Sequence, residues 1–301
     1  MMSRKQSIFP LFFIPLLILA GLSLSCSPRV AGTGTIGVVV TILPQADFVR
    51  AVGGDRVEVS VMVPPGANPH SYEPKPSQIA DFSRAKIYAK VGSGVEFELA
   101  WMDKLLGVNK GIEVIDCSKG VSLLDSSGEY HDADGHGELK DPHIWMSPPN
   151  AVKMVQNIYE GLIRVDPENR GYYESNRDAY INRLTVLDKD IRDRLSGVSN
   201  RRFIAYHSAF EYFAREYGLT TLTVEVDGKE PTAAGVTRLI KEAKDYNIRV
   251  IFTSAEFNPQ SAKVIAGALE GRVVMVDTLP ANYIDSMYIF LDELIKSWEQ
   301  A

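Results

Sequence analysis

Short β-branched runs alternate with longer amphipathic stretches from residue 36 to the end of the chain. This alternation is typical of βαβ units, in which each strand of a parallel sheet is followed by a covering helix. In the first half the pattern predicts strands at 37–42, 57–62, 86–91 and 112–115, with helices at 44–52, 77–83, 96–106 and 149–164. In the second half it predicts strands at 202–206, 221–226, 249–253 and 273–276, with helices at 209–217, 233–246, 259–269 and 283–298. We therefore expect an α/β fold with two parallel sheets, each flanked by helices.

The region between the two halves has a different periodicity. From Glu168 to Leu195 there is no strand signal and no internal proline, and the apolar residues are spaced by three, four or seven positions. This spacing predicts one helix of about 28 residues, roughly 40 Å long at 1.5 Å per residue. Such a helix would join two lobes with limited hinge motion. The expected division is an N-terminal lobe at 36–166, a linker helix at 167–198 and a C-terminal lobe at 199–301.

The first residues have the features of a targeting signal. Arg4 and Lys5 precede an apolar run at 8–24, which ends in small residues before Cys26. This order is typical of a secretion signal. The run is interrupted by two prolines and is short for a membrane span, which needs about 20 residues, although an uncleaved anchor stays open. The stretch also resembles the signal and lipobox of bacterial lipoproteins, which implies a signal peptide at 1–25, lipid modification of Cys26 and a tethered spacer at 26–35.

Composition excludes several classes of protein. Apolar residues make up 45% and charged residues 23%, as in a folded globular protein. The net charge is −6 and no basic run follows the N-terminal segment, so nucleic acid is not an expected partner. Cys26 and Cys117 are the only cysteines in the sequence. A metal bound by this chain must therefore be held by histidines and carboxylates.

Four residues of suitable chemistry stand at structured positions. His70 follows the second predicted strand in a loop stiffened by three prolines. His143 lies two residues after Asp141, whose carboxylate can orient the imidazole, as carboxylates commonly do for metal-bound histidine. His207 and Asp277 each follow a predicted strand, at the sheet edge where open α/β sheets bind their ligands.

Three neutral imidazoles and one carboxylate suit Zn²⁺, which takes four nitrogen and oxygen ligands at roughly 2.0–2.2 Å. Cu(I) prefers thiolates, which are missing here. Taken one at a time, these residues also have simpler roles, because a histidine in a proline loop is often structural and an aspartate after a strand often caps a helix. The polar segment 126–138 carries His131 and His136, either to capture metal or as part of a solvated loop.

Five motifs in this order resemble the metal-binding solute receptors of bacterial ABC importers, a family often called cluster A-I. The motifs are GANPHSYEP at 66–74, DPHIW at 141–145, HSAFEYFA at 207–214, EPT at 230–232 and VDTL at 276–279. The resemblance covers residues 36–299 and implies metal ligation by His70, His143, His207 and Asp277 in a cleft between two lobes. It also implies a lid-like role for the acidic segment with His131 and His136, and it matches Glu256 to a family glutamate near the metal.

The resemblance implies a receptor and not an enzyme. We expect it to capture a divalent transition metal at the extracytoplasmic face of the membrane or in the periplasm, and to deliver the ion to an ABC permease and its ATPase. The imidazole of His207, where manganese-selective relatives have a glutamate, favours Zn²⁺ over Mn²⁺. A monomer is expected, attached to the membrane only through lipid at Cys26.

Three alternatives remain open at this point. The first is a manganese or iron receptor of the same family, and the second is an adhesin. The third is a metal-dependent hydrolase, because three-histidine centres can activate water. Against the hydrolase, a fourth protein ligand would fill the open position, and the sequence has no His-Glu-x-x-His motif.

Overall fold

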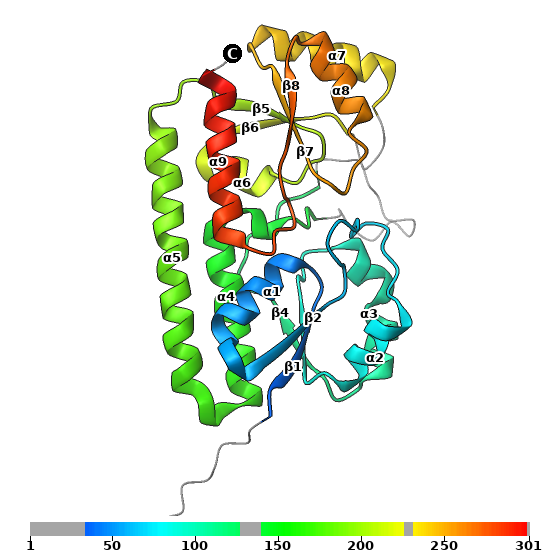
Figure 1. Ribbon diagram of the computed structural model, residues 1–301, viewed down its shortest axis with the longest axis vertical. Coiled ribbons are helices and arrows are strands. Elements are labelled where there is room, and N and C mark those ends of the chain that lie inside the picture. The colour runs from blue at the N-terminus through cyan, green and yellow to red at the C-terminus, as the bar shows by residue number, and fades with distance from the viewer. Residues whose placement is uncertain (1–33, 127–139, 226–230, 300–301) are drawn as a thin grey trace, which may run out of the picture. The chain divides into compact units, whose positions relative to one another are not determined.

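The computed structural model describes residues 34–126, 140–225 and 231–299, and residues 34–301 form one compact unit (Figure 1). The predicted signal peptide, Cys26, His131 and His136 lie outside the described residues. Among the helices of the described part, none has both the length and the apolarity needed to cross a membrane.

The first sheet has four parallel strands in the order β2-β1-β3-β4. Helices α1 and α4 pack on one face of this sheet, and α2 and α3 pack on the other (Figure 1). The strands are β1 (Ile36–Val40), β2 (Val57–Val61), β3 (Ile87–Lys90) and β4 (Glu113–Asp116). The helices are α1 (Leu43–Gly53), α2 (Pro76–Arg84), α3 (Glu96–Val108) and α4 (Pro148–Val165).

The second sheet repeats this topology, with four parallel strands in the order β6-β5-β7-β8. Helices α7 and α8 cover one face, where they enclose a separate apolar cluster, and α6 and α9 cover the other (Figure 1). The strands are β5 (Arg202–Ala205), β6 (Thr220–Thr223), β7 (Val250–Thr253) and β8 (Arg272–Met275). The helices are α6 (Glu211–Tyr217), α7 (Ala233–Asp245), α8 (Gln260–Ala268) and α9 (Tyr283–Glu299). The predicted α/β class with two parallel sheets is confirmed.

The long helix α5 (Arg170–Ser196) has 27 residues and confirms the predicted single helix between the two sheets. It follows a short 3₁₀ turn at Pro167–Asn169 and packs against α4, α1, α6 and α9. Its buried side chains are the six apolar residues whose spacing predicted the helix: Tyr173, Tyr180, Leu184, Leu187, Ile191 and Leu195. One apolar core therefore continues from the first sheet, along α5, to the α6 and α9 face of the second sheet.

Asp47 joins three helices in this core. Its Oδ2 atom accepts a hydrogen bond from the hydroxyl of Tyr180 in α5 at 2.8 Å. The same oxygen accepts one from the backbone N–H of Tyr283, the first residue of α9, at 3.0 Å. One carboxylate in α1 thus fixes the long helix and the last helix to the first sheet.

Prolines explain where several helices begin. Pro44, Pro76 and Pro148 all lie in the first turn of their helices, where a missing N–H costs no hydrogen bond. In α4 the hydroxyl of Ser147 also caps the helix by accepting from the N–H of Asn150. Two further 3₁₀ turns, Gly54–Arg56 and Ile144–Met146, complete the regular structure described here.

Candidate metal centre

His70 is held by the turn that precedes it. The loop after β2 passes through Gly66 with a positive φ of 74°, which favours glycine. Asn68 then accepts the backbone N–H of His70 on its side-chain oxygen at 2.9 Å, an arrangement that fixes a tight turn. The Nδ1 atom of His70 lies 2.8 Å from a carboxylate oxygen of Glu96, at the start of α3. His70 therefore presents Nε2 away from Glu96.

His143 is fixed by one carboxylate at two points. The Oδ1 atom of Asp141 accepts the backbone N–H of His143 at 2.8 Å and contacts its ring Nδ1 at 2.9 Å. Both side chains are almost fully buried, with exposed fractions of 7% for His143 and 6% for Asp141. These two contacts place Asp141 where it can orient the imidazole of His143, as the sequence predicted.

His207 and Glu225 meet because their strands are paired. Residue Ala205 of β5 lies opposite Thr223 of β6 in the parallel register. His207 and Glu225 each follow their paired residue by two positions, so they emerge side by side at the carboxyl edge of the sheet. The Nδ1 of His207 lies 2.6 Å from Oε2 of Glu225.

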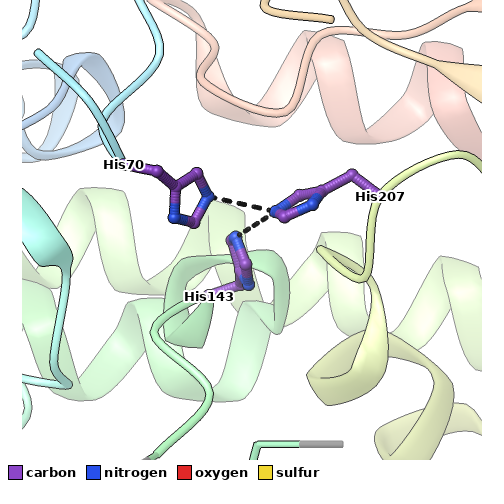
Figure 2. Close-up of side chains that lie close together, drawn as sticks. All are labelled: His70, His143 and His207. Atoms are coloured by element: carbon purple, nitrogen blue, oxygen red, sulfur yellow. Dashed lines mark hydrogen bonds between the residues drawn. The ribbon is translucent and has the colours of Figure 1, made fainter. Parts of the chain in front are cut away.

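The three imidazoles converge (Figure 2). The Nε2 atom of His207 lies 3.1 Å from Nε2 of His70 and 3.3 Å from Nε2 of His143. One ligand atom from each histidine lies within 4.8 Å of the other two. Residues separated by up to 137 positions in the sequence thus turn their ring nitrogens to one point.

The hydrogen-bond pattern leaves this point rich in lone pairs. Each Nδ1 faces an ionisable carboxylate, which when ionised can only accept, so in the neutral form of each ring the proton lies on Nδ1. Each Nε2 then carries a bare lone pair, and three lone pairs facing one another cannot hydrogen bond. A cation at their meeting point would remove this conflict, and backing carboxylates are the usual partners of metal-bound histidines.

Burial keeps one of these imidazoles neutral. The pKa of His207 falls to about 4 because the ring is desolvated and because positive charge on His143 or His70 would repel it, although the hydrogen bond to Glu225 acts in the opposite direction. For Glu96, burial opposes ionisation, but the hydrogen bond and charge of His70 outweigh burial and lower its pKa. At neutral pH the centre therefore combines a neutral imidazole with an ionised backing carboxylate.

A cavity of about 20 Å³ lies beside the three histidines, which is room for one ion or water molecule. Two aromatic rings pack against the imidazoles: Trp145 meets His143 edge to face, with ring centroids 5.3 Å apart, and Phe257 stacks on His207 at 4.6 Å. The indole N–H of Trp145 donates to the carbonyl of Thr278 at 2.8 Å, so the loop after β8 is tied to this wall. The cavity is lined by Pro69, His70, His143, Trp145, His207, Glu256, Phe257, Thr278 and Leu279.

Asp277 follows β8 by two positions and lies outside the 4.8 Å group of ring nitrogens. Its Oδ1 accepts the backbone N–H of Leu279 at 2.9 Å. Burial raises the pKa of Asp277, and so does the negative charge of Glu256, while the Leu279 N–H lowers it. The metal-binding role of Asp277 stays a prediction, whereas Glu256 lines the cavity itself.

The turn that carries Glu96 is fixed by a neighbouring buried glutamate. Between β3 and α3 the chain passes through Gly92 and Gly94 with φ of 85° and 101°. A side chain at Gly92 would clash with Asp116, since its Cβ would lie 2.1 Å from a carboxylate oxygen. Glu98 accepts the N–H groups of Val91 and Gly92 at 2.6 and 2.9 Å. Glu98 thereby holds the start of α3, and with it Glu96, against the sheet.

Glu211, in the first turn of α6, gives the fold a testable pH dependence. Burial and the negative charge of Asp141 raise its pKa to about 7, from 4.5. Because the folded pKa is the higher one, the stability linked to Glu211 is fully present below pH 4.5 and is lost as the pH rises through 7. We expect Glu211→Gln to increase the free energy of unfolding by about 2 kcal/mol at pH 8, less than the full shift implies because solvent partly screens the group.

The measurement for Glu211→Gln is urea unfolding of the metal-free variant and the parent at pH 8 and pH 4.5. The gain should disappear at pH 4.5, where the parent's Glu211 is already neutral in the folded state. Equal gains at both pH values would contradict a buried, ionisable Glu211.

Sequence reasoning missed several residues that shape this centre. Glu96 and Glu225 orient two of the three imidazoles, and Phe257 stacks on one of them. Glu225 was hidden because the strand predicted at 221–226 included it, whereas β6 ends at Thr223 and leaves Glu225 two residues beyond the strand. Glu96 had no signal in the sequence, since only the folding of the His70 loop onto α3 brings it near the histidine.

Two parallel sheets, a long helix between them and a three-imidazole centre are together typical of a metal-binding solute receptor. The chain belongs to the ZnuA family: residues 38–297 match the sequence profile described as zinc-uptake complex component A, periplasmic. This confirms the resemblance found in the sequence.

Individual relatives agree with the family. The high-affinity zinc uptake system protein ZnuA of Bacillus subtilis is 31% identical over 274 residues, which are 85% of this chain and 86% of the relative. A crystal structure of ZnuA superposes with a TM-score of 0.83 and 34% identity, covering 88% of this chain and 99% of the other. FpvC of Pseudomonas aeruginosa, solved in complex with Mn²⁺, has a TM-score of 0.75 and 26% identity, covering 88% and 99% of the two chains.

Proposed function

We propose that this chain captures a single divalent transition-metal ion, zinc by preference, and delivers it to an ABC permease and its ATPase. The observation that carries the proposal is the convergence of three Nε2 atoms on one point, with the Nδ1 atom of each ring in contact with a carboxylate. The family description as a zinc-uptake component supports the same reading. A cavity of about 20 Å³ supports an ion as cargo instead of an organic solute.

The donor set is the argument for zinc. Imidazole nitrogens are borderline donors that suit Zn²⁺, whereas Mn²⁺ prefers carboxylate, carbonyl and water oxygens. His70, His143 and His207 would supply three nitrogens, and one carboxylate would complete a four-coordinate centre. Because a relative of the same fold is known with Mn²⁺, manganese is the second candidate.

The remaining parts of the proposal concern location and movement. A signal peptide at 1–25 and lipid on Cys26 would keep the protein outside the cytoplasm, which agrees with the periplasmic description of the family. We place the lobe boundaries at 36–166 and 199–301, with the helix 167–198 between them. The unbroken core along α5 supports a receptor that closes by small loop movements and not by a wide hinge.

The test is metal binding by the purified full-length protein after treatment with a chelator. Titration in competition with a chromophoric zinc chelator should give one zinc ion per chain, and zinc should raise the melting temperature because the ion binds only the folded state. Manganese should compete poorly. A protein that loses its zinc to the chelator would contradict the proposal. Equal retention of zinc and manganese would contradict the preference for zinc.

A further inference from the structure

The carboxyl edge of the second sheet carries four ionisable side chains in a definite spatial order. The strand order β6-β5-β7-β8 places Glu225 first, His207 second, Glu256 third and Asp277 last, because each follows the end of its own strand. Neighbouring strands lie about 4.8 Å apart. Glu256 therefore emerges one strand away from His207, and Asp277 emerges two strands away.

Glu256 has an oxygen without a partner. Its Oε2 atom is buried and makes no hydrogen bond. A buried carboxyl oxygen that is left unpaired is costly and calls for a specific explanation such as an ion. The side chain lines the cavity beside His70, His143 and His207, so this oxygen and the three bare Nε2 lone pairs border the same space.

Asp277 is less available than Glu256. One of its carboxylate oxygens already accepts the backbone N–H of Leu279, and its side chain does not line the cavity. Glutamate also has one methylene more than aspartate, which extends its reach. The adjacent Phe257 stacks on His207, so the turn that carries Glu256 is packed directly onto one of the histidines.

We propose that Glu256 is the oxygen ligand that closes the metal centre of this chain, in place of Asp277. Neither carboxylate belongs to the 4.8 Å group of imidazoles, so ligation by Glu256 requires a shift of the turn at residues 254–259 toward the histidines. Three neutral imidazoles with one carboxylate would leave a Zn²⁺ centre with a net charge of about +1. This inference rests on the proposed capture of a divalent metal and names the ligand that completes it.

The test uses the full chain with Glu256→Gln and Asp277→Asn, which remove one charge each at nearly constant volume. We expect Glu256→Gln to weaken Zn²⁺ binding in chelator competition by at least about 10-fold, and Asp277→Asn to weaken it by less than about 3-fold. A second readout is the visible spectrum of the Co²⁺-loaded protein, whose bands report the ligands of the ion. Glu256→Gln should change that spectrum, and Asp277→Asn should leave it as in the parent.

Glu270→Gln, at an exposed position just after α8, is the control for loss of one negative charge. Far-UV circular dichroism of the metal-free variants shows whether each one folds. The inference is overturned if Asp277→Asn gives the larger loss and the changed Co²⁺ spectrum, or if neither variant changes the spectrum. In both of those cases the parent still binds zinc, so the proposed function stands; only a parent without zinc binding would remove both.

Discussion

Replacing His70, His143 and His207 together by alanine is expected to abolish zinc binding. These three residues supply the ring nitrogens that meet at the centre, and a carboxylate alone does not compete with a chelator for Zn²⁺ at neutral pH. The loss should exceed the roughly 10- to 100-fold that follows from removing an outer hydrogen-bonding partner. Chelator competition and the zinc-induced rise in melting temperature both measure it.

A matched control removes other imidazoles from the same chain. His131→Ala with His136→Ala deletes the two remaining histidines and should retain one tightly bound zinc ion per chain. Because the mutations leave the carboxylates of Glu96, Asp141 and Glu225 without their imidazole partners, far-UV circular dichroism of the metal-free triple variant is needed to show that it folds. Zinc binding by the triple variant with parental affinity would show that the three-imidazole centre is not the metal site.

Asp47→Ala is expected to give the largest loss of stability among the predictions made for this protein. The change leaves the buried hydroxyl of Tyr180 and the N–H of Tyr283 without their acceptor. Hydrogen bonds to a charged group contribute about 1.5–3 kcal/mol each, so we expect the free energy of unfolding to fall by about 3 kcal/mol or more. Urea unfolding of the metal-free protein, followed by circular dichroism, is the measurement.

Asp55→Ala is the matched control for Asp47→Ala. Asp55 also accepts a tyrosine hydroxyl, that of Tyr172 at 2.8 Å, but at an exposed position. Water replaces the lost acceptor there, so we expect a change within about 0.5 kcal/mol. Similar losses for the two variants would mean that Asp47 does not join α1, α5 and α9 as the structure indicates.

The sequence predicted the elements closely because hydrophobic periodicity is a local property. The strand expected at 57–62 is β2 (Val57–Val61), and the helix expected at 168–195 is α5 (Arg170–Ser196). Both depend on side chains a few positions apart, whose pattern survives in any correct fold. The same local reading singled out His70, His143 and His207, since each stands at the end of a strand or in a stiffened loop.

Contacts between segments that are distant in the sequence could not be predicted from hydrophobic periodicity. Glu96 is 26 positions from His70, and no periodicity relates the two residues. Glu225 pairs with His207 only because β6 lies next to β5, and sequence order alone does not establish that adjacency.

The carboxylates near the candidate metal centre show most clearly what the sequence determined and what depended on the tertiary structure. The sequence determined that Glu256 and Asp277 each follow a strand, because strand ends are marked locally by a change from apolar to polar residues. Only the tertiary structure decided that β7 lies between β5 and β8, and so that Glu256 stands nearer to His207. The physical reason is that strand order depends on which surfaces pack together across the whole chain, and that information is not contained in any short stretch of it.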